Sequence, residues 1–123
     1  MGEWIACKDG FIVADVIRWK EAVWDRSSRK KDAKPKKIGE RAVVAEVKRE
    51  DIAEGWVWLA VLDCATRASG KKPVETYRAG VEVKRKRATI EREGFERLPW
   101  SDESARAILV VERQAAEAAT PAG

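Results

Sequence analysis

The stretch Arg41–Cys64, RAVVAEVKREDIAEGWVWLAVLDC, indicates the fold class most clearly. Its first arm, RAVVAEVKRE, places valine and alanine on one face at positions 43, 45 and 47. That period of two is typical of a strand with one buried face. The second arm is apolar on both parities from Trp56 to Leu62, which predicts a central strand covered on both sides. A polar turn at residues 51–55, closed by Gly55, joins the arms into a hairpin.

Upstream of this hairpin, the sequence predicts two further strands. Glu3–Cys7 is a short candidate, and an Asp-Gly turn separates it from the extended stretch Phe11–Trp19. Glu21–Trp24 either extends the second strand or begins the next loop. Asp15 interrupts the apolar face, either at a bulge or bend or by bonding a neighbouring backbone group. A catalytic carboxylate is the less favoured interpretation, because no second group is placed to work with it.

Downstream of the hairpin, a polar connection at residues 65–76, ATRASGKKPVET, leads into a further extended stretch. Its SGKK fails the phosphate-loop pattern, which requires Ser or Thr directly after the lysine at position 71. Tyr77–Arg92 is then predicted to be extended. The parity of its apolar residues switches across the KRKR run at residues 84–87, which indicates a bulge or an edge strand there.

The C-terminal segment predicts a helix over residues 101–118, SDESARAILVVERQAAEA. Ser101 suits the N-cap, and two acidic residues follow in the first turn. The apolar run at residues 108–111 suits a closing strand as well. The expected fold is therefore mainly β: a small SH3-like or OB-like, partly open barrel of about five strands with a C-terminal α-helix. We expect one domain over residues 1–117, with a basic excursion at 25–37 and a frayed tail at 118–123.

Composition argues against several classes of function. The 123 residues include 25 basic and 21 acidic side chains but no histidine, which removes the commonest general base and metal ligand. Cys7 and Cys64 alone cannot form a zinc site, so we expect no metal and no cofactor. No catalytic motif is present, which favours a protein that is not an enzyme. No secretory signal or membrane-length apolar run is visible, which predicts a cytoplasmic protein with reduced cysteines.

Two basic clusters are the first functional signal. Residues 25–37, DRSSRKKDAKPKK, hold seven basic and two acidic side chains, which predicts a mobile loop. Together with the KRKR run they could neutralise the phosphates of a nucleic acid and release its counterions. The other interpretation is a solvated loop and an edge strand that charge protects from aggregation. The candidate contacts are Arg29, Lys30, Lys31, Lys34, Lys36, Lys37, Lys84, Arg85, Lys86 and Arg87.

The six tryptophans are the second signal. Trp56 and Trp58 share one face of their strand, where they are either part of the core or a platform for bases or a proline-rich peptide. The leading hypothesis is a non-catalytic module that binds single-stranded DNA or RNA through the basic clusters and these two rings. The alternative is a protein-interaction adaptor or homo-oligomerising module that uses the tryptophan face or a sheet edge.

Overall fold

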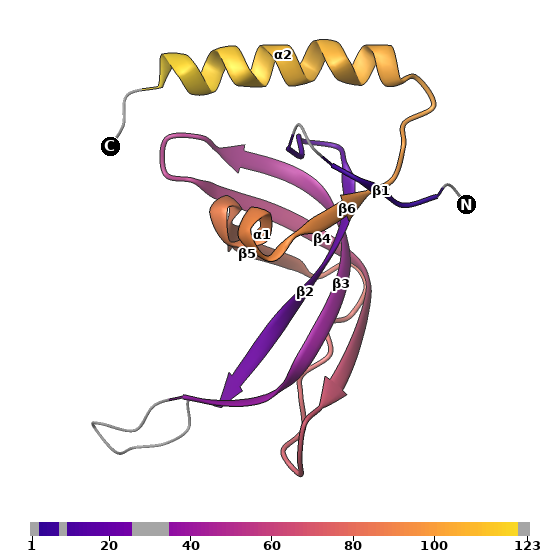
Figure 1. The fold of residues 1–123 in the computed structure, drawn as a ribbon, viewed down its shortest axis with the longest axis vertical. Coiled ribbons are helices and arrows are strands. Elements are labelled where there is room, and N and C mark those ends of the chain that lie inside the picture. Colours follow the sequence, from indigo (N-terminus) through magenta and orange to yellow (C-terminus); the bar gives the residue numbers. More distant parts are fainter. Residues whose placement is uncertain (1–2, 8–9, 26–34, 121–123) are drawn as a thin grey trace.

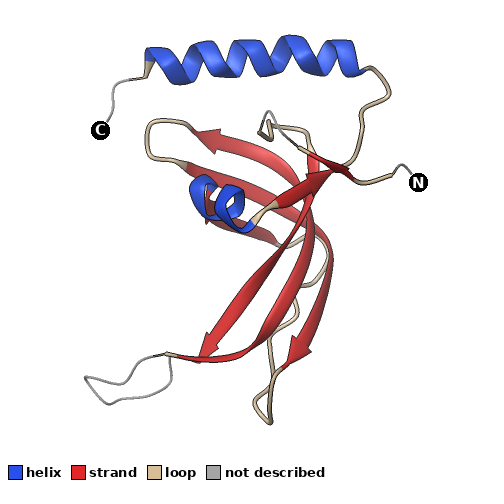
Figure 2. Ribbon diagram, in the orientation of Figure 1, coloured by secondary structure: helices blue, strands red, loops and turns tan. Residues whose placement is uncertain are grey.

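The computed structural model describes residues 3–7, 10–25 and 35–120. In that part of the chain the strands form one six-stranded antiparallel sheet in the order β1-β6-β2-β3-β4-β5 (Figures 1 and 2). The strands are β1 (Ile5–Ala6), β2 (Val16–Asp25), β3 (Lys36–Asp51), β4 (Trp56–Ala68), β5 (Glu82–Lys86) and β6 (Phe95–Arg97). The helices are α1 (Arg87–Glu93) and α2 (Glu103–Ala119). The prediction of a mainly β chain with a C-terminal helix is confirmed.

The hairpin of β3 and β4 forms as predicted, with Gly55 at a positive φ of 77° in its turn. One face of the sheet, here called the inner face, carries the buried side chains of both strands: Val43, Ala45, Val47, Val57, Leu59 and Val61. The expectation that β4 is covered on both sides was wrong. Trp56 and Trp58 lie on the opposite, outer face and are only half-buried. Basic side chains of the neighbouring strands reach over their rings.

Strand β2 begins and ends later in the sequence than the predicted strand Phe11–Trp19. Phe11 and Ile12 are buried, but the chain turns after them, with Ala14 at φ 80°. Asp15 stabilises this turn, because its carboxylate accepts the N–H of Ile12 and its own N–H donates to the Ile12 carbonyl. The regular strand therefore starts at Val16 and continues through residues 21–24 to Asp25.

The change of parity at residues 84–87 marks the end of a strand and the start of a helix, so the predicted continuous extended stretch was wrong. Strand β5 stops at Lys86, and α1 follows directly with Ile90 buried against the core. Gly94, at φ 90°, ends α1 and lets the chain enter the three-residue strand β6. The predicted edge position is confirmed, since β5 pairs with β4 alone within the described residues.

The sheet is open. Among the described residues, its edge strands β1 and β5 have no hydrogen-bonded partner on their outer sides, so no barrel closes. Helix α2 includes residues 107–112 and lies across the end of the sheet near the β3–β4 turn (Figure 1). Asp102 caps it instead of Ser101, because the Asp102 carboxylate accepts the N–H of Ala105.

Ion pairs attach α2 to the sheet, with little apolar contact: Arg106 and Val110 are its only buried residues. The Arg106 guanidinium binds both oxygens of Asp15, at 2.9 Å from Nε and 2.7 Å from Nη2. Trp100 Nε1 donates to the same carboxylate at 2.7 Å, and two turns further along α2 Arg113 binds Glu50 at 2.7 Å. The structural role expected for Asp15 is confirmed.

Candidate nucleic-acid interface

A row of alternating aromatic and basic side chains crosses the outer face of β3, β4 and β5. The register places Trp58 between Arg49 of β3 and Lys84 of β5, and Trp56 opposite Lys86. The Arg49 guanidinium lies 3.9 Å from the centre of the Trp58 ring. Lys84 Nζ lies 4.3 Å from the Trp56 ring and 5.2 Å from Trp58, and Lys86 Nζ lies 4.3 Å from Trp56. We call these five residues the tryptophan–cation ladder.

The three cations of the ladder carry charge that no neighbouring carboxylate neutralises. In the part of the chain that the structure describes, Arg49, Lys84 and Lys86 form no ion pair, although Lys86 Nζ donates to the Glu54 carbonyl at 2.8 Å. A cation over an indole gains about 0.5–1 kcal/mol at an exposed site. The rings therefore hold three positive charges in a fixed row and leave them available to an anion.

The other two members of the KRKR run, Arg85 and Arg87, form internal ion pairs. Arg85 binds Glu21 at 3.0 Å and the Tyr77 hydroxyl at 2.8 Å, and Arg41 binds the same carboxylate at 3.0 Å. Burial raises the pKa of Glu21, but hydrogen bonds from Arg85, Trp19 and Arg41 outweigh it and hold the pKa below its ordinary value. Arg85 is therefore committed to an internal ion pair, beside Tyr77, which packs against the core.

Arg87 is committed in the same way. It is buried at the start of α1, where Nη1 lies 3.2 Å from Glu50 and Nη2 donates to the Phe11 carbonyl. It also binds Glu91 one turn along the helix. Of the four residues predicted to contact phosphates from the KRKR run, only Lys84 and Lys86 therefore face outward with their charges unpaired among the described residues.

The described candidate contacts of the other predicted basic cluster, Lys36 and Lys37, do not join the ladder. Lys36 and Lys37 are exposed at the start of β3, whereas Arg49 lies near its other end, so about 40 Å of strand separates them. Arg29, Lys30, Lys31 and Lys34 lie outside the described residues. Lys36 and Lys37 therefore lie toward the end of β3 that is opposite to Arg49 and the ladder.

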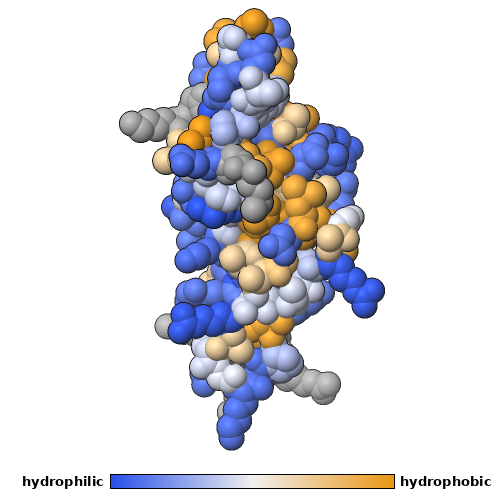
Figure 3. Space-filling view, turned by 90° about the vertical axis from the view of Figure 1, so that its right-hand side faces the viewer, coloured by the Kyte–Doolittle hydropathy of each residue, from blue (hydrophilic) through white to orange (hydrophobic). Residues whose placement is uncertain are grey.

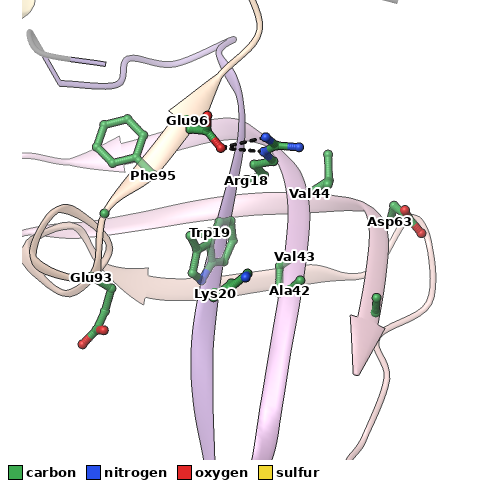
Figure 4. A pocket seen from close by; sticks show the side chains of 12 residues that line it. Arg18, Trp19, Lys20, Ala42, Val43, Val44, Asp63, Glu93, Phe95 and Glu96 are labelled. Carbon is green, nitrogen blue, oxygen red and sulfur yellow. Dashed lines mark hydrogen bonds and ion pairs between the residues drawn. The ribbon is translucent and has the colours of Figure 1, made fainter. Parts of the chain in front are cut away.

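Four adjoining hollows run along the strands between these two ends, and the first three of them lie on the outer face. The first, of about 560 Å³, has Ala42 and Val44 in its lining and the Arg18–Glu96 ion pair at 2.7 Å (Figure 4). Each hollow shares lining residues with the next: Lys20, Ala42 and Ala65, then Glu40 and Arg67, then Ser69. Figure 3 shows that the side of the molecule on the right of Figure 1 has apolar residues gathered at its centre and hydrophilic ones around them.

Sequence reasoning missed Arg49, which completes the ladder. By simple alternation Arg49 shares the parity of the buried Val47, which would turn it to the inner face. The register between β3 and β4 shifts between Val47 and Arg49, and this irregularity turns Arg49 to the outer face. Arg18, Lys20 and Arg67, which line the hollows, are isolated charges in strands and carry no sequence signal of their own.

Comparison with protein families, curated proteins and solved structures returns no match for this chain. Among the described residues, no group of three or more Cys, Asp or Glu side chains is placed to hold a metal ion. Cys7 and Cys64 are half-buried and form no disulfide with each other. The helices in that part of the chain are too short or too polar to cross a membrane.

Proposed function

We propose that this protein binds single-stranded nucleic acid along the outer face of β3, β4 and β5, and that it has no catalytic activity of its own. The observation that carries the proposal is the tryptophan–cation ladder, in which three cations without a carboxylate partner among the described residues alternate with two half-buried indoles. A single strand offers the complementary alternation of anionic phosphates and planar bases. Fixed cations lose little entropy on binding phosphates, which favours affinity.

Phosphate contacts are the main source of affinity in this proposal. The cations already lie over the indole rings, so a base that stacks on Trp56 has to displace a lysine side chain. Phosphates can bind Lys84, Lys86 and Arg49 without that displacement. Binding should therefore depend steeply on salt and only weakly on base sequence.

A binding assay with matched variants tests the proposal. The probe is a fluorescently labelled single-stranded oligonucleotide of about 16 nucleotides, which exceeds the footprint of most small β modules. Trp58→Leu keeps apolar bulk but removes the ring that fixes two cations, so we expect affinity to fall about two- to tenfold. Trp24→Leu is the control, because Trp24 is an exposed indole with no cation over its ring within the described residues. Equal effects of the two substitutions contradict the proposed interface.

The architecture supports the expectation of a small barrel-like module. Strand β6 returns to pair with β2, and α1 connects β5 directly to β6. In the described sheet β6 also pairs with β1, so the free edges are those of β1 and β5, and only pairing between these two strands is missing from a closed ring. We infer that the sheet is an opened form of the SH3-like or OB-like barrel predicted from the sequence.

Self-association is a second candidate function, and the apolar side of α2 favours it. Ile108 and Val111 are 61% and 64% exposed, which is unusual for large apolar side chains on a monomer. Ala115 and Ala118 continue the same spacing of three and four residues, which is typical of a helix that pairs with another helix. The occupant that this uncharged, self-complementary stripe suits is α2 of a second copy. The surface differs from the tryptophan face and the sheet edge that the sequence suggested.

A further inference from the structure

The fourth hollow lies where the long strands end away from α2. Its volume is about 400 Å³. It joins the end of β2 and the start of β3 to the bend after β4, which lies more than thirty residues further along the chain. We call it the basic hollow, and its lining among the described residues consists of Asp25, Lys36, Lys37, Ile38, Ser69, Gly70, Lys71 and Lys72.

Gly39 makes this juxtaposition possible. A Cβ at position 39 would lie 2.4 Å from the Arg67 carbonyl oxygen and 2.5 Å from Val74 Cγ2, so no other residue fits without a shift of the backbone. The close approach lets the Ser69 N–H donate to the Ile38 carbonyl at 2.9 Å. The bend that carries the lysines at 71 and 72 is thereby fixed beside those at 36 and 37.

Among the described residues that line the basic hollow, positive charge exceeds negative charge. Lys72 binds Asp25, and Lys37 binds Glu40 at 2.9 Å. Within the described residues, Lys36 and Lys71 form no ion pair. Two uncompensated ammonium groups in one concave site attract an anion more strongly than the same charges on a flat surface, because the surrounding protein concentrates their field.

We propose that the basic hollow binds a phosphate group. Lysines act as compact point charges that suit a phosphate approached from several sides, and the Ser69 hydroxyl can add a hydrogen bond. The SGKK segment that failed the phosphate-loop pattern thus contributes by another geometry, from a bend with no helix behind it. The site is independent of the tryptophan–cation ladder and stands even if the ladder binds no nucleic acid.

The phosphate can belong to a nucleic-acid strand or to a small phosphate compound, and the test separates these sources. Tripolyphosphate is titrated into the full-length protein at low salt while the backbone NMR signals of residues 36–38 and 69–72 are followed. The second probe is an oligonucleotide with and without a 5′-phosphate. We expect tripolyphosphate to shift these signals. A further preference for the 5′-phosphorylated strand identifies a strand end, and binding of tripolyphosphate alone identifies a small compound.

Variants decide whether the basic hollow is responsible. The double substitution of Lys36 and Lys71 by Ala should weaken tripolyphosphate binding at least tenfold, since each removes a charged hydrogen bond. Lys48→Ala is the control, because Lys48 is an exposed lysine that lies outside the hollow and pairs with Glu46. Trp58→Leu should leave tripolyphosphate binding unchanged, which separates this site from the ladder. Absence of shifts at residues 36–38 and 69–72, or equal weakening by Lys48→Ala, overturns the proposal.

Discussion

Replacing Arg106 by Met should strongly destabilise the protein, because it leaves the carboxylate of Asp15 buried without its cation. Asp15 is 0% exposed and Arg106 2% exposed, so water cannot replace the guanidinium. Within the described residues, two donors to the Asp15 carboxylate remain, the Ile12 N–H and Trp100 Nε1. Removal of one member of a buried ion pair costs about 3–5 kcal/mol. That is a large part of the roughly 6–18 kcal/mol expected for a chain of this length.

The assay is thermal unfolding followed by circular dichroism. A decrease of about 3–5 kcal/mol in the free energy of unfolding should lower the melting temperature of a chain of this size by about 10–20 °C. Arg92→Met is the control, because the Arg92 side chain is 73% exposed and its replacement should change stability by at most about 0.5 kcal/mol. Replacing Asp15 by Ala in the Arg106→Met background should recover part of the stability, since no buried charge then remains at position 15. A melting temperature within about 2 °C of wild type for Arg106→Met refutes this account of how α2 is attached.

Two further predictions concern α2. Hydrogen bonds from Arg97, and one from the Trp100 N–H, lower the pKa of Glu103 from 4.5 to about 2. The stability that Glu103 contributes is therefore present above about pH 4.5 and disappears as the pH falls towards 2; melting temperatures across this range should fall less in Glu103→Gln than in wild type. For self-association, sedimentation equilibrium should show a dimer that Ile108→Lys and Val111→Lys convert to a monomer with little change in melting temperature. A wild-type protein that stays monomeric at every concentration excludes that second candidate.

The parts of the fold that could be predicted from the sequence are those with a local signal. Alternation at residues 41–47 and a glycine turn define the β3–β4 hairpin, and an acidic start followed by alanines defines α2. Strand β6 has three residues and exists because it pairs with β2, a contact between segments about eighty positions apart, so no local pattern indicates it. The α1 helix was missed because seven residues after a basic strand show too little periodicity.

The candidate site was predicted only in part, because a local sequence pattern does not show which face of a strand is covered. Alternation correctly placed Trp56 and Trp58 on one face, but it could not show whether a second layer covers that face. In the KRKR run, alternation along β5 separates Lys84 and Lys86 from Arg85, and only the fold shows which side is the core. Arg49 joins the ladder through a register shift that depends on the partner strand.

The salt dependence of oligonucleotide binding tests the central claim most directly. Dissociation constants are measured by fluorescence anisotropy over a series of salt concentrations for wild type, for the double substitution of Lys84 and Lys86 by Ala, and for the control Arg92→Ala. We expect wild type and the control to show the same steep log–log slope. The double variant should bind more weakly, and its slope should be smaller by roughly 0.7 for each phosphate that it no longer neutralises. Failure of wild type to bind any single-stranded oligonucleotide at low salt, or an unchanged slope in the double variant, contradicts the claim that the tryptophan–cation ladder is a nucleic-acid interface.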